Sequence, residues 1–234
     1  LVFNHIYVAE GAKLTISEGA KLYMHGGANI VVDGELECRG TFEHPVVIRG
    51  DRFDCINDVD QTPYDQTPNQ WGGIYLQNAQ SHNIIENTHV RGASMGILLV
   101  GANRSEPGVE VRNSVVHNSG AYGVYAQQGS LVIENTEISN CGESCIVQLG
   151  GTLRMAHTTV ANYYRYASRE NASVRILNYV MQNGVRLTFP VTSAVIENSI
   201  IFGGNAEELE LGQDTTSVTD YNVLLSHTLI KGKK

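Results

Sequence analysis

Short runs of alternating apolar and polar residues, each ended by a turn residue, follow one another along most of the chain. From about residue 83 onward the runs surround a recurring asparagine, with one apolar residue shortly before it and another shortly after it. Alternation with a period of two predicts strands rather than helices. The recurring position is held by Asn87, Asn113, Asn135, His157, Asn178, Asn198 and Tyr221. Its spacing of 20 to 26 residues predicts a solenoid of stacked turns.

Turn residues recur at a second point of each repeat. They are Asn118, Asn140, Asn162 and Asn183, with Gly92 and Gly203 in other turns. Both residue types tolerate the left-handed backbone that tight corners need. A third strand follows in several repeats, at residues 96–99, 123–126 and 145–148. Three strands and three corners in roughly 22 residues make one coil, so we predict an all-β fold, a single-stranded right-handed parallel β-helix of about nine coils.

The repeat divides the chain into three stretches of one predicted domain, 1–234. Residues 1–50 carry short alternating strands between glycine turns, which predicts the first coils. Residues 51–70 form an acidic loop insertion, and residues 71–234 form the asparagine-ladder coils. A repeat that runs through most of a chain favours one elongated domain over two compact ones.

The run Ile/Val-Glu-Asn-Ser/Thr-x-Ile/Val resembles the asparagine ladder of right-handed parallel β-helix proteins, the pectin-lyase-like superfamily, from about Trp71 to the end. The resemblance implies asparagines that point inward and bond to backbone groups at the corner, a structural role. The implied ladder is Asn87, Asn113, Asn135, His157, Asn178 and Asn198. Residues 49–51 with 64–74 also look similar to uncharacterised β-helix envelope proteins of gut-type Gram-negative bacteria. That likeness implies an exported protein of the outer surface or periplasm, with a lipid-anchored parent.

Charge and composition narrow the function classes. The net charge of −8 and the pI near 5.4 argue against nucleic acid as a partner, because phosphate binding needs clustered Lys and Arg. No apolar run approaches the roughly 18 residues of a membrane span. Of the four cysteines, Cys38 and Cys145 are expected to be buried free thiols, with a disulfide between Cys141 and Cys145 left open.

An outward stripe of apolar and aromatic side chains is the first candidate binding surface. Aligned third strands place Ile74, Ile97 and Val124 inward and so turn Tyr75, Leu98 and Tyr125 outward. Aromatic rings can stack on sugars or bury against a protein. Alternatively, the loop at 51–70 simply covers this stripe.

A second candidate surface is the run Tyr164-Arg165-Tyr166, which lies in an irregular stretch that replaces a regular corner. Stacking and hydrogen bonding would let these side chains hold an acidic or neutral glycan. The other interpretation is that the rings cover the side of the solenoid while their polar ends reach water.

Two groups of carboxylates are weaker candidates for chemistry. Glu197 and Asp220 precede two ladder positions without an intervening base, and an acid pair on adjacent coils is the arrangement that a glycosidase needs. Asp54, Asp58 and Asp60 concentrate oxygen ligands of the kind that Ca²⁺ prefers, although their spacing matches no EF-hand. We expect a solvated loop there and no cofactor.

The sequence therefore predicts a non-catalytic module of the cell envelope that binds a polysaccharide or a surface protein through a lateral face. The alternative is a carbohydrate-active enzyme, a polysaccharide lyase or glycoside hydrolase, which only the superfamily resemblance favours.

Overall fold

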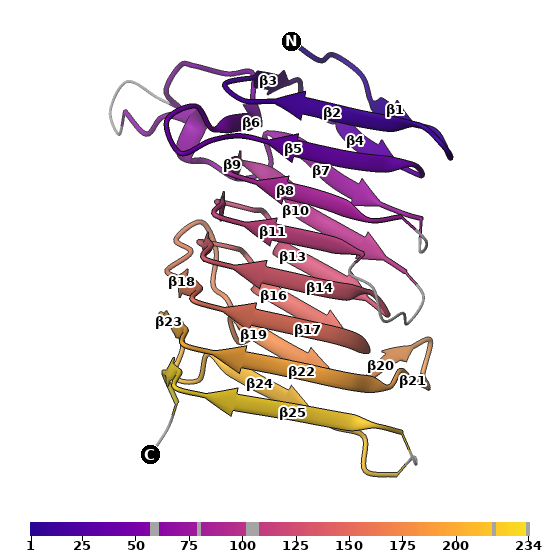
Figure 1. Cartoon of the computed structure of the whole chain (residues 1–234). Coiled ribbons are helices and arrows are strands. Elements are labelled where there is room, and N and C mark those ends of the chain that lie inside the picture. The colour runs from indigo at the N-terminus through magenta and orange to yellow at the C-terminus, as the bar shows by residue number, and fades with distance from the viewer. Residues whose placement is uncertain (57–60, 79–80, 102–107, 217–218, 233–234) are drawn as a thin grey trace.

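The computed structural model describes residues 1–56, 61–78, 81–101, 108–216 and 219–232. There the chain winds into a parallel β-helix, and each coil adds one strand to each of three parallel sheets (Figure 1). Each sheet has 8 strands in the described part of the chain. The predicted fold class is confirmed, with eight coils instead of about nine.

The strands of the three sheets follow one another in strict rotation. The first sheet contains β1 (Ile6–Val8), β4 (Asn29–Val32), β7 (Trp71–Leu76), β10 (Ala93–Val100), β13 (Tyr122–Gln127), β16 (Ser144–Leu149), β19 (Val174–Leu177) and β24 (Leu209–Gly212). The second contains β2 (Lys13–Ser17), β5 (Glu35–Arg39), β8 (Asn83–Glu86), β11 (Val109–Arg112), β14 (Ser130–Glu134), β17 (Gly151–Ala156), β22 (Val191–Glu197) and β25 (Tyr221–Ser226). The third contains β3 (Lys21–Met24), β6 (Val46–Gly50), β9 (Thr88–Arg91), β12 (Val115–His117), β15 (Glu137–Ser139), β18 (Thr159–Asn162), β23 (Ile200–Gly203) and β26 (Leu229–Ile230).

Alternate residues of every sheet point into one continuous apolar core. Ile74, Ile97 and Val124 are fully buried and lie in register on adjacent strands. Stacking β-branched and aliphatic side chains coil upon coil removes them from water along the whole axis, which stabilises the solenoid. Among the described residues, no helix is long and apolar enough to cross a membrane.

One asparagine of the predicted ladder lies elsewhere. Asn178 follows β19 of the first sheet, where its Oδ1 accepts the backbone N–H of Asp214 (2.6 Å). After it comes an antiparallel hairpin, β20 (Tyr179–Gln182) and β21 (Val185–Thr188). The hairpin turns at Asn183 and Gly184, both with positive φ, as a two-residue hairpin loop requires. The stretch after Asn178 therefore contributes this hairpin rather than a coil corner, and the coil count falls to eight.

The remaining ladder residues share one corner, between the second and third sheets. Asn87, Asn113, Asn135, His157, Asn198 and His227 all have φ between 45° and 51°. His227 takes the place that the sequence assigned to Tyr221, because Ser226 of β25 is the residue in register with Glu197. A single left-handed residue at this point turns the chain sharply from one sheet into the next.

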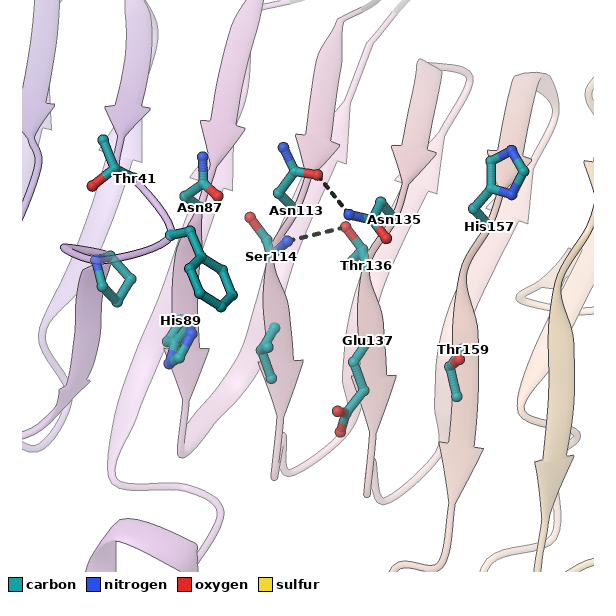
Figure 2. Close-up of a pocket in the computed structure, with 13 residues that line it drawn as sticks. Thr41, Asn87, His89, Asn113, Ser114, Asn135, Thr136, Glu137, His157 and Thr159 are labelled. Atoms are coloured by element: carbon teal, nitrogen blue, oxygen red, sulfur yellow. Dashed lines mark hydrogen bonds between the residues drawn. The ribbon is translucent and has the colours of Figure 1, made fainter.

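The inward placement of these asparagines is wrong. Asn113 and Asn135 are exposed, and Asn135 Nδ2 donates to Asn113 Oδ1 (2.8 Å) on the outside of the corner (Figure 2). The buried column is the next residue of each coil, which is Ser or Thr. Its members Thr88, Ser114, Thr136, Thr158 and Ser199 are at most 3% exposed. Because the left-handed residue breaks the strand alternation, the inward direction passes to the residue after it.

These hydroxyls satisfy the backbone where no regular ladder exists. Ser114 Oγ accepts the backbone N–H of Thr88 (3.1 Å), and Thr136 Oγ1 accepts that of Ser114 (3.4 Å). Ser199 Oγ accepts the backbone N–H of Thr158 (3.2 Å) in the same way. The polar ladder inside this solenoid is therefore built from Ser and Thr.

The second set of predicted corners is confirmed in part. Gly92, Asn118 and Asn140 have positive φ between the third and first sheets. Asn162 belongs to β18 and is fully buried, with its amide bonded to the backbone of Cys141 on both sides. Cys141 and Cys145 are buried free thiols.

The loop at 51–70 includes a 3₁₀ turn, η1 (Tyr64–Gln66), and packs on the third sheet. Asp65 forms ion pairs with Arg49 of β6 (3.0 Å) and Arg91 of β9 (2.7 Å). The described loop residues thus cover the third sheet, not the predicted stripe on the first. Trp71, at the end of the loop, is 1% exposed.

Candidate binding face

The residues that best fit a binding site lie along the outer face of the third sheet. One column of outward residues runs through His89, Val115, Glu137 and Thr159, which are paired in register on β9, β12, β15 and β18. Each lies two residues after a ladder-corner residue. The exposed corner side chains therefore border this column along the solenoid axis (Figure 2).

A groove of about 750 Å³ follows this border, and we call it the ladder groove. Its lining is Thr41, Phe42, Pro45, Asn87, His89, Asn113, Ser114, Val115, Asn135, Thr136, Glu137, His157 and Thr159. The loop between β5 and β6 closes one end, where the side chain of Phe42 is 89% exposed. Side-chain amides, two imidazoles and hydroxyls then follow at coil intervals of about 4.8 Å.

The lining of the ladder groove combines polar and apolar surface and carries little charge. Ser139 Oγ donates to Glu137 Oε1 (2.9 Å), which leaves the other carboxylate oxygen facing the solvent side. Burial lowers the pKa of His89, and the nearby Arg91 cation lowers it further, against a smaller opposing effect of Glu137. His89 is therefore neutral near pH 7 and can both donate and accept a hydrogen bond.

A second cavity, of about 470 Å³, lies at the opposite border of the same sheet, and we call it the loop pocket. Its lining is Gln66, His117, Asn118, Asn140, Tyr163, Tyr164, Arg165 and Tyr166. The predicted patch Tyr164, Arg165 and Tyr166 is thus part of a cavity. Its role in binding stays a prediction.

The sequence reasoning missed the other groups of these two cavities. Asn118 and Asn140 are corner residues, to which the pattern assigns a structural role, and His117 is the last residue of β12. His89 and Glu137 were overlooked because no motif surrounds them. The signal that was available is positional, since the residue two after each ladder corner points outward.

A family model described as a right-handed β-helix region matches residues 69–229, well over half of the chain. The chain belongs to the right-handed β-helix family. No curated protein and no solved structure matches it. The matched segment extends from just before β7 to β26, so it includes the part of the β-helix that carries the ladder corner.

The residues of the predicted outward stripe lie in register on adjacent strands. Tyr75, Leu98 and Tyr125 are aligned on β7, β10 and β13 of the first sheet, and all three are half-buried. Burial raises the pKa of both Tyr75 and Tyr125. The ring of Tyr122 lies 5.1 Å from that of Tyr125. Whether the stripe binds a partner stays a prediction.

The prediction that Glu197 and Asp220 form an acid pair on adjacent coils is wrong. Glu197 ends β22 and forms an ion pair with Arg154 (3.1 Å). Asp220 precedes β25, and its carbonyl accepts the N–H of Val191 at the opposite end of the sheet. Because Asp220 stands level with the start of β22, the two carboxylates cannot act on one bond. The residues that lead into β25 shift the repeat, so alignment by sequence pairs Glu197 with Asp220 instead of with Ser226.

Alternating charges cover the second sheet instead. Arg112 lies in register between Glu86 and Glu134. Arg112 forms an ion pair with Glu134, and Arg154 forms another with the same carboxylate (3.2 Å). Acids on this face are therefore partnered by arginines, which relieves like-charge repulsion between coils.

Among the described residues, the structure brings no calcium ligands together. Asp54 pairs with Arg52 in the exposed loop, and Asp58 and Asp60 lie outside the described residues. Within the described ranges, no group of three or more His, Cys, Asp or Glu side chains is placed to hold a metal ion.

Proposed function

We propose that this β-helix is a glycan-binding module that holds an extended neutral polysaccharide in the ladder groove. The observation that carries the proposal is the outward, solvent-facing position of the corner amides beside a groove of about 750 Å³. Uncharged groups that donate and accept hydrogen bonds suit sugar hydroxyls, and an exposed aromatic ring such as Phe42 suits the apolar face of a sugar ring.

The direction of the groove supports a polymer as the ligand. Asn87, Asn113, Asn135 and His157 occupy successive coils, so the same kind of contact recurs at intervals of about 4.8 Å. That interval is comparable to the length of one pyranose unit in an extended chain. A repeating ligand can therefore meet the same contacts along several coils.

The chemistry of the lining argues against other partners. No described Lys or Arg lines the groove, which disfavours a polyanion such as nucleic acid. Glu137 is its only carboxylate among the described lining residues, whereas the usual glycoside hydrolases act with two. We therefore propose binding rather than cleavage.

The experiment is affinity electrophoresis of the purified chain through gels that contain glucan, mannan, xylan or homogalacturonan. We expect at least one neutral polysaccharide to retard the protein. Asn135→Gly should weaken that retardation about fivefold, because glycine keeps the left-handed corner while one hydrogen bond of about 1 kcal/mol is lost.

Asn198→Gly is the matched control, because Asn198 has the same corner conformation but does not line the groove. Tyr125→Ala separates the two faces. Weakened binding in Tyr125→Ala together with normal binding in Asn135→Gly and Phe42→Ala would move the site to the stripe. Failure of every polysaccharide to bind would rule out the proposed function.

We also propose that the protein works outside the cytoplasm, at the outer surface or in the periplasm of a bacterium. The resemblance of residues 49–51 and 64–74 to envelope β-helix proteins supports this location. Fractionation of the source cells with an antibody against the chain tests it, and a purely cytoplasmic signal would contradict it.

A further inference from the structure

The loop pocket is walled by two loops that are far apart in the sequence. The Tyr166 hydroxyl donates to the backbone carbonyl of Gln66 across the pocket (3.0 Å). Asp65, the neighbour of Gln66, is held by ion pairs to Arg49 and Arg91. Tyr163 is fixed on the other side, where its backbone N–H donates to Asn140 Oδ1 (3.2 Å). The walls are therefore held in place by specific contacts.

The floor of the pocket presents polar groups without protein partners. Asn118 is only 7% exposed, yet its side-chain amide makes no hydrogen bond within the described part of the chain. The ring nitrogens of His117 likewise have no hydrogen-bond partner among the described residues. His117 is half-buried, and the polar atoms of both side chains reach the surface of the cavity. Two such groups side by side are therefore free to bond a polar ligand.

Aromatic rings surround the mouth. Tyr163 is 57% exposed and Tyr166 is 38% exposed. The rings of Tyr164 and Tyr166 meet edge to face with centroids 5.6 Å apart, and the Arg165 guanidinium lies 5.5 Å from the Tyr166 ring. Exposed rings above a polar floor match the two faces of a sugar, which has apolar C–H groups and hydroxyls.

We propose that the loop pocket is a second, separate site that binds a single neutral sugar residue, at the end or a branch of a glycan. Its volume of about 470 Å³ falls in the range of about 300 to 1,000 Å³ for small-ligand sites. Burial lowers the pKa of His117 to about 4, and the Arg91 cation contributes to the shift. The imidazole is thus neutral near pH 7, and a neutral imidazole can donate to one hydroxyl and accept from another.

The site stands independently of the ladder groove, because none of the described residues lines both cavities. Saturation-transfer NMR with the methyl glycosides of glucose, galactose, mannose, N-acetylglucosamine and glucuronic acid tests it. We expect at least one neutral methyl glycoside to bind. Tyr163→Ala, in an exposed loop, should weaken that binding about tenfold, and His117→Leu should weaken it at least as much.

His89→Leu is the matched control, since His89 lies on the same sheet face but lines only the ladder groove. It should leave monosaccharide binding unchanged while weakening the retention of the polysaccharide. The proposal is overturned if no neutral methyl glycoside binds, if only the glucuronide binds, or if Tyr163→Ala and a folded His117→Leu both bind like the parent. Loss of polysaccharide retention alone would count against the groove and leave this site standing.

Discussion

At the scale of single residues, the corner between the second and third sheets assigns different tasks to two neighbours. The left-handed residue, such as Asn135, turns the chain and faces solvent. The next residue, such as Thr136, is 3% exposed and bonds to the backbone of the adjacent coil. Stability and recognition are thus separated within two positions of the sequence.

This separation predicts opposite outcomes for two substitutions. Thr136→Val should destabilise the protein by about 1–3 kcal/mol, because a buried N–H loses its acceptor. Asn135→Gly should change the free energy of unfolding by only a few tenths of a kcal/mol, because glycine adopts the same backbone without strain. Urea unfolding followed by circular dichroism measures both. Equal destabilisation by the two changes would contradict the assignment of the buried ladder.

His117 should make stability depend on pH. Its folded pKa is about 4, whereas an unfolded histidine has a pKa of about 6.5. Between these values the unfolded chain binds more protons, so this contribution is fully present above about pH 6.5 and is lost as pH falls toward 4. The contribution amounts to up to about 3 kcal/mol. Unfolding of the parent and of His117→Leu at pH 7 and pH 4.5 should show a smaller pH effect in the variant. Identical pH effects in both proteins would show that His117 titrates normally.

At the scale of elements, the stretch that follows β18 is locked onto the last coil by a buried ion pair. Arg169 and Glu208 are 4% and 0% exposed in their side chains, and their charged atoms lie 2.6 Å apart. Glu208 also accepts hydrogen bonds from Ser173 and from the backbone of Asn205. Burial alone would raise the pKa of Glu208, but these hydrogen bonds and Arg169 lower it overall.

Glu208→Gln should therefore destabilise the β-helix by about 3 kcal/mol or more, because it leaves the Arg169 cation buried without a counter-charge. The exposed Glu170, next to Arg169, provides the control, and Glu170→Gln should change stability by less than about 0.5 kcal/mol. Thermal unfolding at neutral pH compares the two. A Glu208→Gln protein that melts with the parent would mean that the pair adds nothing to stability.

At the scale of the whole molecule, the solenoid repeats the same kind of corner side chain on successive coils. The corner residues that line the ladder groove come from successive coils. Sheets that extend along the full axis hold these corners at a constant spacing of about 4.8 Å. A rigid array of this kind is pre-organised for an extended ligand, which reduces the entropy lost on binding.

The array predicts how affinity should depend on ligand length. For the polysaccharide retained by the protein, titration calorimetry with its oligosaccharides should show affinity rising up to about four sugar units and then levelling off, because each coil adds contacts of about 1 kcal/mol. Phe42→Ala should lower the affinity of the longer oligosaccharides more than that of the shortest. A flat dependence on length would mean that only one coil makes contact.

The sequence by itself determined the solenoid, the rotation of three strands and three corners, and the inward positions of Ile74, Ile97 and Val124. These features follow from alternation and turn residues, which are local properties repeated in every coil. The same pattern placed Arg112 between Glu86 and Glu134, because register in a parallel solenoid follows from the repeat itself.

Only the tertiary structure decided which way the corner side chains face and which repeats are coils. One left-handed residue shifts the inward direction by a single position, and alternation does not show that shift. Asn178 fits the sequence pattern of a ladder residue although it follows a strand of the first sheet, because the pattern does not show to which sheet a strand belongs. The loop pocket needed the fold as well, because Gln66 and Tyr166 are joined by a contact across 100 positions of sequence, and local pattern holds no record of which loops meet.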